Sequence, residues 1–332
     1  MFRRILLRLT LFLVLACAVA VGSTAEARGP AWKVYAVRYA TIPKFPVHEL
    51  VSGADTTRTV DIAMMFWVLE GPDRRHVLVD AGFYRQKFLD DWKPADYRRP
   101  SDAVRELGIA ADSVTDVIIS HIHWDHVDGA DLFPNARIWI QREEYAHYVG
   151  DRGEPLDAAI DTVDAAMLAE LHRAGRVQLV DGDAKEILPG ITAYTGGKHT
   201  FASQYVGVRT AKGTVVVASD NCYLYENLDK HRPIAQTLDA KSNLAAQDRM
   251  KRLASKPQWI VPLSGRWYVQ TMDGKRVEMA VGDISFGEDQ NTKPNAQGQK
   301  GHMSGTAGEA PAVLMIVQLA SPPTVGQPCH FE

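Results

Sequence analysis

Three histidines and an aspartate stand within six residues of the chain, in the run His121-Ile122-His123-Trp124-Asp125-His126. His121 and His123 are two positions apart at the end of a predicted strand, so their side chains point the same way and can reach one metal ion. Asp125 and His126 follow where the chain has to turn, and they can face a second metal. Neutral imidazole and carboxylate are the ligands that zinc takes in hydrolytic sites. An exposed polar loop is the alternative, but this density of ligands directly after an apolar strand favours a metal-dependent hydrolase.

The residues before this cluster predict the elements that hold it in place. Residues 114–120 are rich in β-branched side chains and run as a strand directly into His121. Residues 62–69 form a continuous apolar run, as in a strand buried on both faces. Residues 76–80 return after a turn at residues 71–73, so the two strands predict a hairpin. A strand that ends in a loop is where rigid scaffolds commonly present functional side chains.

Strands and helices alternate through the rest of the first 262 residues. The further predicted strands are residues 32–39, 136–140, 177–180, 191–194, 205–209 and 214–218. Helices are predicted at residues 101–107, where Ser101 can cap the first turn, and at residues 154–174 and 238–254. Mixed strands with interspersed helices indicate an α/β or α+β sandwich.

The pattern changes after Pro262. The remainder has no convincing amphipathic helix, and a polar stretch rich in Asn, Gln and Gly covers residues 288–300. Short strands are predicted at residues 267–271, 276–279 and 313–319, with Asp273-Gly274 as a hairpin turn between the first two. This part of the chain therefore predicts a short all-β segment.

The first 27 residues are typical of a secretory signal peptide. A basic start is followed by an apolar run from Ile5 to Val21, and small residues precede a cleavage point after Ala27. A retained anchor is the alternative, but the uninterrupted apolar stretch is shorter than the ~20 residues that a membrane span needs. We therefore expect a secreted or periplasmic protein with no membrane segment after cleavage. A lipid-modified Cys17 is a weaker alternative.

Bulk charge and cysteine content set two further limits. The net charge of -3 and the pI near 6.4 give no positive field for a phosphate backbone, so nucleic acid is not expected as a partner. Cys222 and Cys329 remain after removal of the signal peptide. In an oxidising compartment they could form a disulfide, and two free thiols are the equally open alternative.

The motif His-x-His-x-Asp-His resembles the signature of the metallo-β-lactamase superfamily. The resemblance implies an α+β fold, an αβ/βα sandwich over residues 28–262, that binds one or two metal ions, usually Zn²⁺. Asp80 resembles the family's buried aspartate, which orients the metal loop. The metal ligands that the resemblance implies are His121, His123 and His199 for the first ion, Asp125 and His126 for the second, and Asp220 for both.

Within the superfamily, the chain looks most like the N-acyl-homoserine lactonase branch. Trp124 and residues 127–129 follow that branch, and Tyr223 matches a tyrosine that contacts the substrate's carbonyl or leaving oxygen. A half-buried tyrosine at a strand end is the equally weighted alternative. The implied activity is hydrolysis of a small-molecule lactone or ester, in which a metal-bound hydroxide opens the ring and Asp125 orients it or accepts a proton. A thioester, a β-lactam or a sulfate ester is the alternative substrate.

One ligand of the family pattern is missing from this chain. The family usually supplies a last histidine in a turn after a late strand, but residues 258–261 are followed here by Pro262-Leu263-Ser264-Gly265. The next histidines are His302 and His330. We therefore expect one well-held metal and a second, weaker one, unless His302 takes the missing place. A catalytically impaired metal-binding protein is the alternative.

The missing histidine coincides with the change of composition. Residues 263–332 resemble the second part of a small cupin domain, through residues 263–269, 273–274, 282–284 and 300–302. We interpret the chain as a metallo-β-lactamase-like domain at residues 28–262, without its last strands, joined to a partial cupin-like segment. A divergent C-terminus of a single domain is the alternative.

Overall fold

The computed structural model describes residues 31–211, 213–254, 258–281, 283, 285–287, 296, 302–309 and 312–318. The signal peptide predicted at residues 1–27 lies outside this part of the chain, and so does Cys329. Cys222 takes part in no disulfide among the described residues, so its pairing with Cys329 stays a prediction. None of the described helices is both long and apolar enough to cross a bilayer.

Six strands form the first sheet, in the order in which they follow along the chain. They are β1 (Lys33–Pro46), β2 (Thr59–Glu70), β3 (His76–Val79), β4 (Val114–Ile118), β5 (Arg137–Gln141) and β6 (Val177–Val180). The pairs β1–β2 and β2–β3 are antiparallel, which confirms the predicted hairpin. The pairs β3–β4, β4–β5 and β5–β6 are parallel, so the ends of β3 and β4 meet at one edge.

Four antiparallel strands form the second sheet and pack against the first. They are β7 (Lys185–Leu188), β8 (Ile191–Thr195), β9 (Gln204–Thr210) and β10 (Gly213–Val217), in the order β10-β9-β8-β7. Val79 and Ile118 of the first sheet share one buried cluster with Ile191, Val206 and Val208 of the second. The apolar runs predicted as strands therefore meet between the two sheets, whereas β7 was not predicted.

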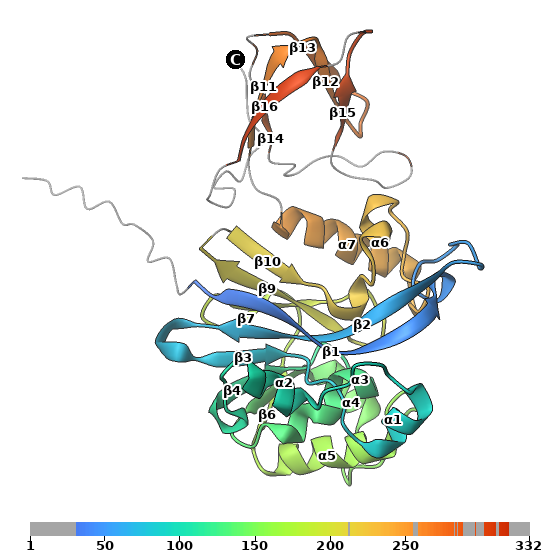
Figure 1. The fold of residues 1–332 in the computed structure, drawn as a ribbon, viewed down its shortest axis with the longest axis vertical. Helices are drawn as coiled ribbons and strands as arrows, with labels where there is room; N and C mark the ends of the chain where they lie inside the picture. The colour runs from blue at the N-terminus through green and yellow to red at the C-terminus, as the bar shows by residue number, and fades with distance from the viewer. Residues whose placement is uncertain are drawn as a thin grey trace, which may run out of the picture.

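Helices cover the outer faces of both sheets, as Figure 1 shows. The helices over the first sheet are α1 (Gln86–Trp92), α2 (Pro100–Glu106), α3 (Trp124–Val127), α4 (Arg142–Tyr148) and α5 (Thr162–Arg173), and those over the second are α6 (Tyr225–Asp229) and α7 (Ala240–Ala254). The layers are helix, sheet, sheet and helix. This arrangement confirms the predicted αβ/βα sandwich.

All three predicted helix starts were wrong: α7 begins at Ala240 and not at residue 238, and the other two differ for evident local reasons. The helix predicted from residue 154 begins only at Thr162, because Asp161 accepts a hydrogen bond from the backbone N–H of Val163 at 3.0 Å and caps the first turn. The helix predicted with a Ser101 cap has Arg99 as its cap instead, two residues earlier, and Pro100 at its first position. Proline suits that position because its missing N–H needs no partner there.

The strand predicted as buried on both faces is buried only along part of its length. Phe66, Val68 and Leu69 of β2 are fully buried. Ile62 and Met64 of the same strand are only half-buried, because they line a large cavity. The continuous apolar run therefore serves two purposes, a packed core at one end and a cavity wall at the other.

The C-terminal strands form two small antiparallel sheets, which confirms the predicted all-β segment. The strands are β11 (Gln258–Ser264), β12 (Trp267–Thr271), β13 (Arg276–Met279), β14 (Ser285–Gly287), β15 (His302–Thr306) and β16 (Val313–Gln318). They pair in the orders β14-β11-β16 and β13-β12-β15, beyond α6 and α7 in Figure 1. The predicted boundary at Pro262 falls inside β11, whose residues on both sides pair with β16. The resemblance to a cupin domain stays a prediction.

A buried carboxylate links α5 to the segment that follows the metal-binding motif. Asp164 of α5 is fully buried, and neither of its carboxylate oxygens has a hydrogen-bond donor among the described residues. Arg85, which bonds to Asp128, has its nearest guanidinium nitrogen 3.6 Å from Asp164. Burial first, and then the neighbouring Asp128, raise the pKa of Asp164 to about 9. At neutral pH Asp164 therefore keeps its proton.

This carboxyl makes the free energy of unfolding depend on pH. The folded protein holds a proton on Asp164 that the unfolded chain releases near the ordinary pKa of 3.8, so stability is lost as the pH rises from about 4 to about 9. The substitution Asp164→Asn removes that loss. We expect the variant to gain stability over the wild type between pH 5 and pH 8, as measured by urea unfolding. Asp151→Asn, at an exposed position, is the control; equal pH trends for both variants would contradict the assignment.

Candidate metal centre

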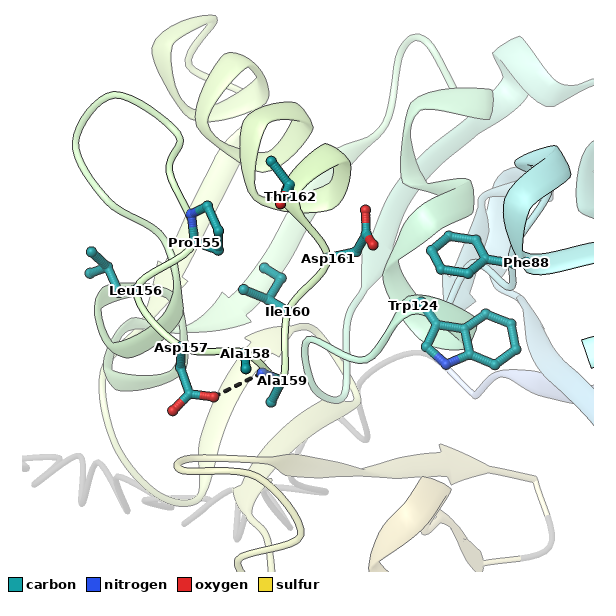
Figure 2. Close-up of a pocket in the computed structure, with 10 residues that line it drawn as sticks. All are labelled: Phe88, Trp124, Pro155, Leu156, Asp157, Ala158, Ala159, Ile160, Asp161 and Thr162. Carbon is teal, nitrogen blue, oxygen red and sulfur yellow. Dashed lines mark hydrogen bonds between the residues drawn. The ribbon is translucent and has the colours of Figure 1, made fainter. Parts of the chain in front are cut away.

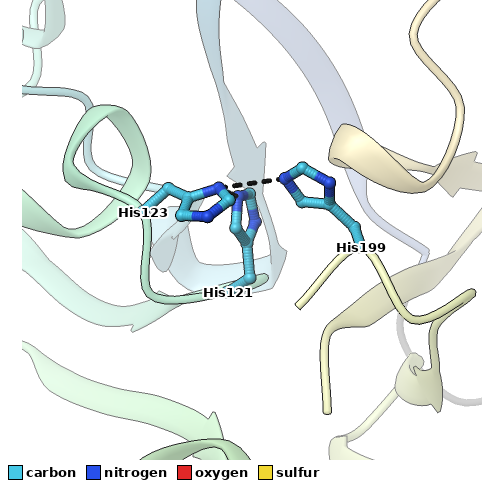
Figure 3. Close-up of side chains that lie close together, drawn as sticks. All are labelled: His121, His123 and His199. Carbon is cyan, nitrogen blue, oxygen red and sulfur yellow. Dashed lines mark hydrogen bonds between the residues drawn. The ribbon is translucent and has the colours of Figure 1, made fainter. Parts of the chain in front are cut away.

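Three histidines converge on one point between the two sheets. His121 follows β4, His123 precedes α3, and His199 lies in the loop between β8 and β9. The Nδ1 atom of His123 is 3.0 Å from Nε2 of His121 and 3.0 Å from Nε2 of His199 (Figure 3). All three ring nitrogens can therefore face a single ion. Their convergence is the one that the resemblance predicted.

A second cluster lies beside the first and shares one carboxylate with it. Nε2 of His126 is 3.4 Å from Oδ2 of Asp125 and 3.4 Å from Oδ1 of Asp220. The other oxygen of Asp220, Oδ2, is 3.5 Å from Nε2 of His199 and 3.8 Å from Nε2 of His121. Asp220 thus presents one oxygen to each cluster. Every predicted metal ligand is brought to this place, while metal binding itself stays a prediction.

Asp80 holds the loop that carries these histidines. Its carboxylate is fully buried and accepts three hydrogen bonds. The donors are the backbone N–H of Ser120 at 2.8 Å, Nδ1 of His126 at 2.9 Å and the hydroxyl of Ser219 at 2.8 Å. The side chain therefore orients the metal loop, as predicted.

The hydrogen bonds of the histidines leave ring nitrogens available for a metal. Nδ1 of His199 donates to the backbone carbonyl of Gln236 at 2.7 Å, and Nδ1 of His126 donates to Asp80. In a neutral imidazole, the other nitrogen then carries the lone pair. Nε2 of His126 is buried and has no hydrogen-bond partner among the described residues. An unpartnered buried nitrogen of this kind fits a metal ligand.

The electrostatics of the two clusters also suit a cation. Burial, followed by the neighbouring histidines, lowers the pKa of His121 well below its usual value and that of His123 to about 4, so both rings are neutral at neutral pH. Burial opposes a charge on His126, but the carboxylates of Asp125 and Asp220 outweigh it and raise the pKa of that ring. The second cluster therefore attracts positive charge.

The two clusters differ in the number of ligands. The first offers three imidazoles and one oxygen of Asp220, which completes a four-ligand set for zinc. The second offers His126, Asp125 and the other oxygen of Asp220. Of the C-terminal residues that the structure describes, none joins either cluster, and His302 lies in β15. The position of the missing histidine is thus not filled from that part of the described chain.

Tyr223 lies at the edge of the centre, where the resemblance predicted it. Its ring packs edge-on to that of His199, with centroids 5.9 Å apart. Burial first, and then Asp220 and Asp125, raise the pKa of its hydroxyl far above the usual value. The phenol therefore stays protonated and can donate a hydrogen bond. Its contact with a substrate stays a prediction.

A cavity of about 900 Å³ opens over the two clusters. His123, Asp125, His126 and Asp220 lie at its polar end together with Tyr223. Its remaining walls are mainly apolar and include Ile42, Phe45, Leu50, Ile62, Met64 and Leu228. Such a cavity can hold a small molecule that has one polar end and an apolar tail.

Trp124 separates this cavity from a smaller one. Its ring stacks on those of Phe88 and Trp92, with centroids 4.9 and 5.1 Å apart. Figure 2 shows the smaller cavity, of about 530 Å³, between Phe88, Trp124 and residues 155–162. Its lining includes no residue of the two clusters. Trp92, which lines the large cavity, was not singled out from the sequence.

Glu144 of α4 is a second buried carboxylate that the sequence did not reveal. Its Oε1 accepts hydrogen bonds from the backbone N–H of Ile122 at 3.2 Å and from the hydroxyl of Thr200 at 2.5 Å. Its Oε2 accepts one from the backbone N–H of Ala202 at 2.6 Å. Ile122 lies between two predicted ligands, and Thr200 follows His199. Glu144 therefore joins the two loops that supply the three histidines, and no spacing pattern could have linked it to them.

The chain matches a known family and several known enzymes. Residues 64–266 match the metallo-beta-lactamase superfamily. An N-acyl homoserine lactonase of Bacillus cereus is 29% identical over 160 residues, which cover 48% of this chain and 58% of that enzyme. The N-acyl homoserine lactonase AiiB of Agrobacterium fabrum is 26% identical over 133 residues, which cover 38% and 47%. This chain thus matches only about half the length of these curated relatives.

Solved structures of such enzymes share the fold. A quorum-quenching N-acyl homoserine lactone lactonase has a TM-score of 0.55 and 21% identity, over 66% of this chain and 85% of that one. An N-acyl homoserine lactone hydrolase with N-hexanoyl-L-homoserine at its catalytic metal centre has a TM-score of 0.55 and 20% identity, over 66% and 87%. At this identity the likeness establishes the fold alone.

The substitution Glu144→Gln tests the link between the histidine loops. The amide has one acceptor and one donor group, so at least one of the backbone N–H groups that face Glu144 loses its acceptor. We expect divalent-metal affinity to fall about 10-fold or more, as measured by competition with a chromophoric chelator. Glu143→Gln, at the exposed neighbouring position on α4, is the matched control. Equal affinities of the two variants would show that Glu144 does not support the centre.

Proposed function

The chain belongs to the metallo-beta-lactamase superfamily, and from this premise we propose that it is a zinc-dependent hydrolase that opens the ring of an N-acyl homoserine lactone or a similar lactone. The observation that carries the proposal is the position of Asp220, whose two oxygens face two ligand clusters at the polar end of a large, mainly apolar cavity. The lactonases among the similar proteins support the same substrate class.

The residues present fit zinc on the ground of their donor atoms. His121, His123 and His199 would hold the first ion, Asp125 and His126 the second, and Asp220 both. Zinc bound in such a site polarises a carbonyl oxygen and lowers the pKa of coordinated water to near neutrality. The unpartnered nitrogen of His126 and the neutral rings of His121 and His123 support this assignment.

Two side chains at the clusters, Asp125 and Tyr223, have separate roles in the proposed hydrolysis. Asp125 points its carboxylate at the same place as His126, so it can orient the attacking water and accept its proton. Tyr223 stays protonated beside Asp220, so its hydroxyl can donate a hydrogen bond to the oxygen of the breaking ester bond. Both Asp125 and Tyr223 line the large cavity.

The shape of the cavity supports a substrate with a polar ring and an apolar tail. The ring would lie against the clusters, and the tail along the wall formed by Ile42, Ile62 and Met64. A mutant of B. thuringiensis AiiA, with a TM-score of 0.54 and 21% identity over 66% of this chain and 87% of that one, binds N-decanoyl-L-homoserine at its active site. A comparable acyl tail suits the volume available here.

The same geometry also fits two alternatives to lactone hydrolysis. A thioester, a β-lactam or a sulfate ester also presents an electrophilic centre to such a site. A catalytically impaired metal-binding protein is favoured by one observation: in the second cluster, the carboxylates that lie within 3.4 Å of Nε2 of His126 are those of Asp125 and Asp220, among the described residues.

Substrate turnover distinguishes these possibilities. We expect the purified protein to hydrolyse long-chain N-acyl homoserine lactones faster than nitrocefin, a glutathione thioester or an aryl sulfate. Acid release can be followed with a pH indicator. A chelator should lower the rate at least ~100-fold and added zinc should restore it. The side chains of the two clusters would bind the metal, and the metal would activate the water and the carbonyl group. Preference for another member of the panel would replace the lactone, and no turnover of any member would favour the non-catalytic alternative.

Metal content tests the difference between the two clusters. We expect one zinc per chain at near-full occupancy after dialysis and a second that is substoichiometric, because the first cluster has one ligand more than the second. Elemental analysis of the dialysed protein measures both. Two tightly bound zinc ions per chain would contradict the expected weakness of the second cluster.

A further inference from the structure

Two serine hydroxyls connect a predicted ligand of the first cluster to the carboxylate that orients the second. Nδ1 of His121 is 2.9 Å from the hydroxyl of Ser120, which is 2.8 Å from the hydroxyl of Ser219. The hydroxyl of Ser219 is in turn 2.8 Å from Oδ2 of Asp80. Both serines are buried, at 1% and 7% exposure, so water does not compete for these contacts.

The carboxylate sets the direction of the whole series. An ionised carboxylate only accepts hydrogen bonds, and each hydroxyl has one proton to donate. Ser219 must therefore donate to Asp80, which leaves its oxygen to accept from Ser120. Ser120 has then used its proton and accepts one from Nδ1 of His121. The remaining nitrogen of that ring, Nε2, is left without a proton and faces the other two histidines.

We propose that Ser219 is a positioning residue that holds His121 in its metal-binding tautomer through Ser120. The tautomer changes no charge, because the neutral ring only moves its proton from one nitrogen to the other. The proposal rests on the metal-binding part of the proposed function and not on lactone hydrolysis.

The backbone at Ser219 supports a specific role for its hydroxyl. Its φ is +48°, a conformation that side-chain-bearing residues rarely adopt. Ser219 also directly precedes Asp220 and lies 3.4 Å from Nδ1 of His126. A strained residue that persists beside a functional group is one whose position the surrounding structure enforces. Here the enforced position brings one hydroxyl into contact with Ser120 and Asp80 and within 3.4 Å of Nδ1 of His126.

Loss of the Ser219 hydroxyl would reverse the hydrogen bond between Ser120 and His121. Among the described residues, the contacts of the Ser120 hydroxyl are those with His121 and Ser219. Without Ser219, its proton has only Nδ1 of His121 as an acceptor. The ring proton then lies on Nε2, which points at the metal position, and has to leave that nitrogen before an ion can bind there. Removing Ser120 as well takes away the donor that causes this change.

The substitution Ser219→Gly provides the test, because glycine accepts a positive φ without strain and the fold is retained. Zinc affinity, measured by competition with a chromophoric chelator, should fall about 10-fold or more. The double variant Ser120→Ala with Ser219→Gly should bind zinc more tightly than Ser219→Gly alone. A double variant that binds as weakly as Ser219→Gly, or more weakly, would overturn the proposal.

The tautomer itself can be observed in the metal-free protein. We expect ¹⁵N NMR of the histidine rings to place the His121 proton on Nδ1 in the wild type and on Nε2 in Ser219→Gly. Ser203→Ala is the matched control, because it removes a buried hydroxyl that bonds to Asn221 and, among the described residues, to no histidine. An unchanged tautomer in Ser219→Gly would refute the assignment. If the two proteins differ in this way but the wild type hydrolyses no lactone, the proposed lactonase activity is wrong and the role of Ser219 still stands.

Discussion

The buried carboxylate of Asp80 is the contact on which the rest of the centre depends. It joins three segments: the residues after β4 through Ser120, helix α3 through His126, and the residues after β10 through Ser219. A charge taken out of water is costly unless donors surround it, and three donors do so here. The backbone adds to the link, because the N–H of Ala81 donates to the carbonyl of His126 at 2.8 Å.

The second constraint is that the predicted ligands come from both sheets. The run from His121 to His126 extends from β4 in the first sheet, whereas His199 and Asp220 follow β8 and β10 in the second. Their side chains meet only when the apolar faces of the two sheets are packed together. The same packing leaves Ile62 and Met64 along an open cavity wall. The core thus determines both the geometry of the clusters and the space available to a substrate.

Local features of this protein could be predicted from its sequence, because backbone geometry alone sets them. One is the shared direction of the His121 and His123 side chains, which are two positions apart, and another is the hairpin of β2 and β3. Contacts that depend on the packing of distant segments could not be predicted. Glu144 bonds to Ile122 and Thr200, which are 22 and 56 residues away, and no periodic pattern marks it. The start of α5 was misplaced because the apolar pattern continued upstream of the cap at Asp161.

The shared position of Asp220 has a consequence for the folding of the chain. Ser120 and Ser219, which adjoin the two halves of the centre, are 99 residues apart in sequence. An ion held between these halves would act as a cross-link that closes a long loop, in the manner of a disulfide, and long loops cost the most entropy to close. The free energy of metal binding would then be part of the free energy that keeps the two sheets together. The centre would then cross-link the two sheets in addition to binding a substrate.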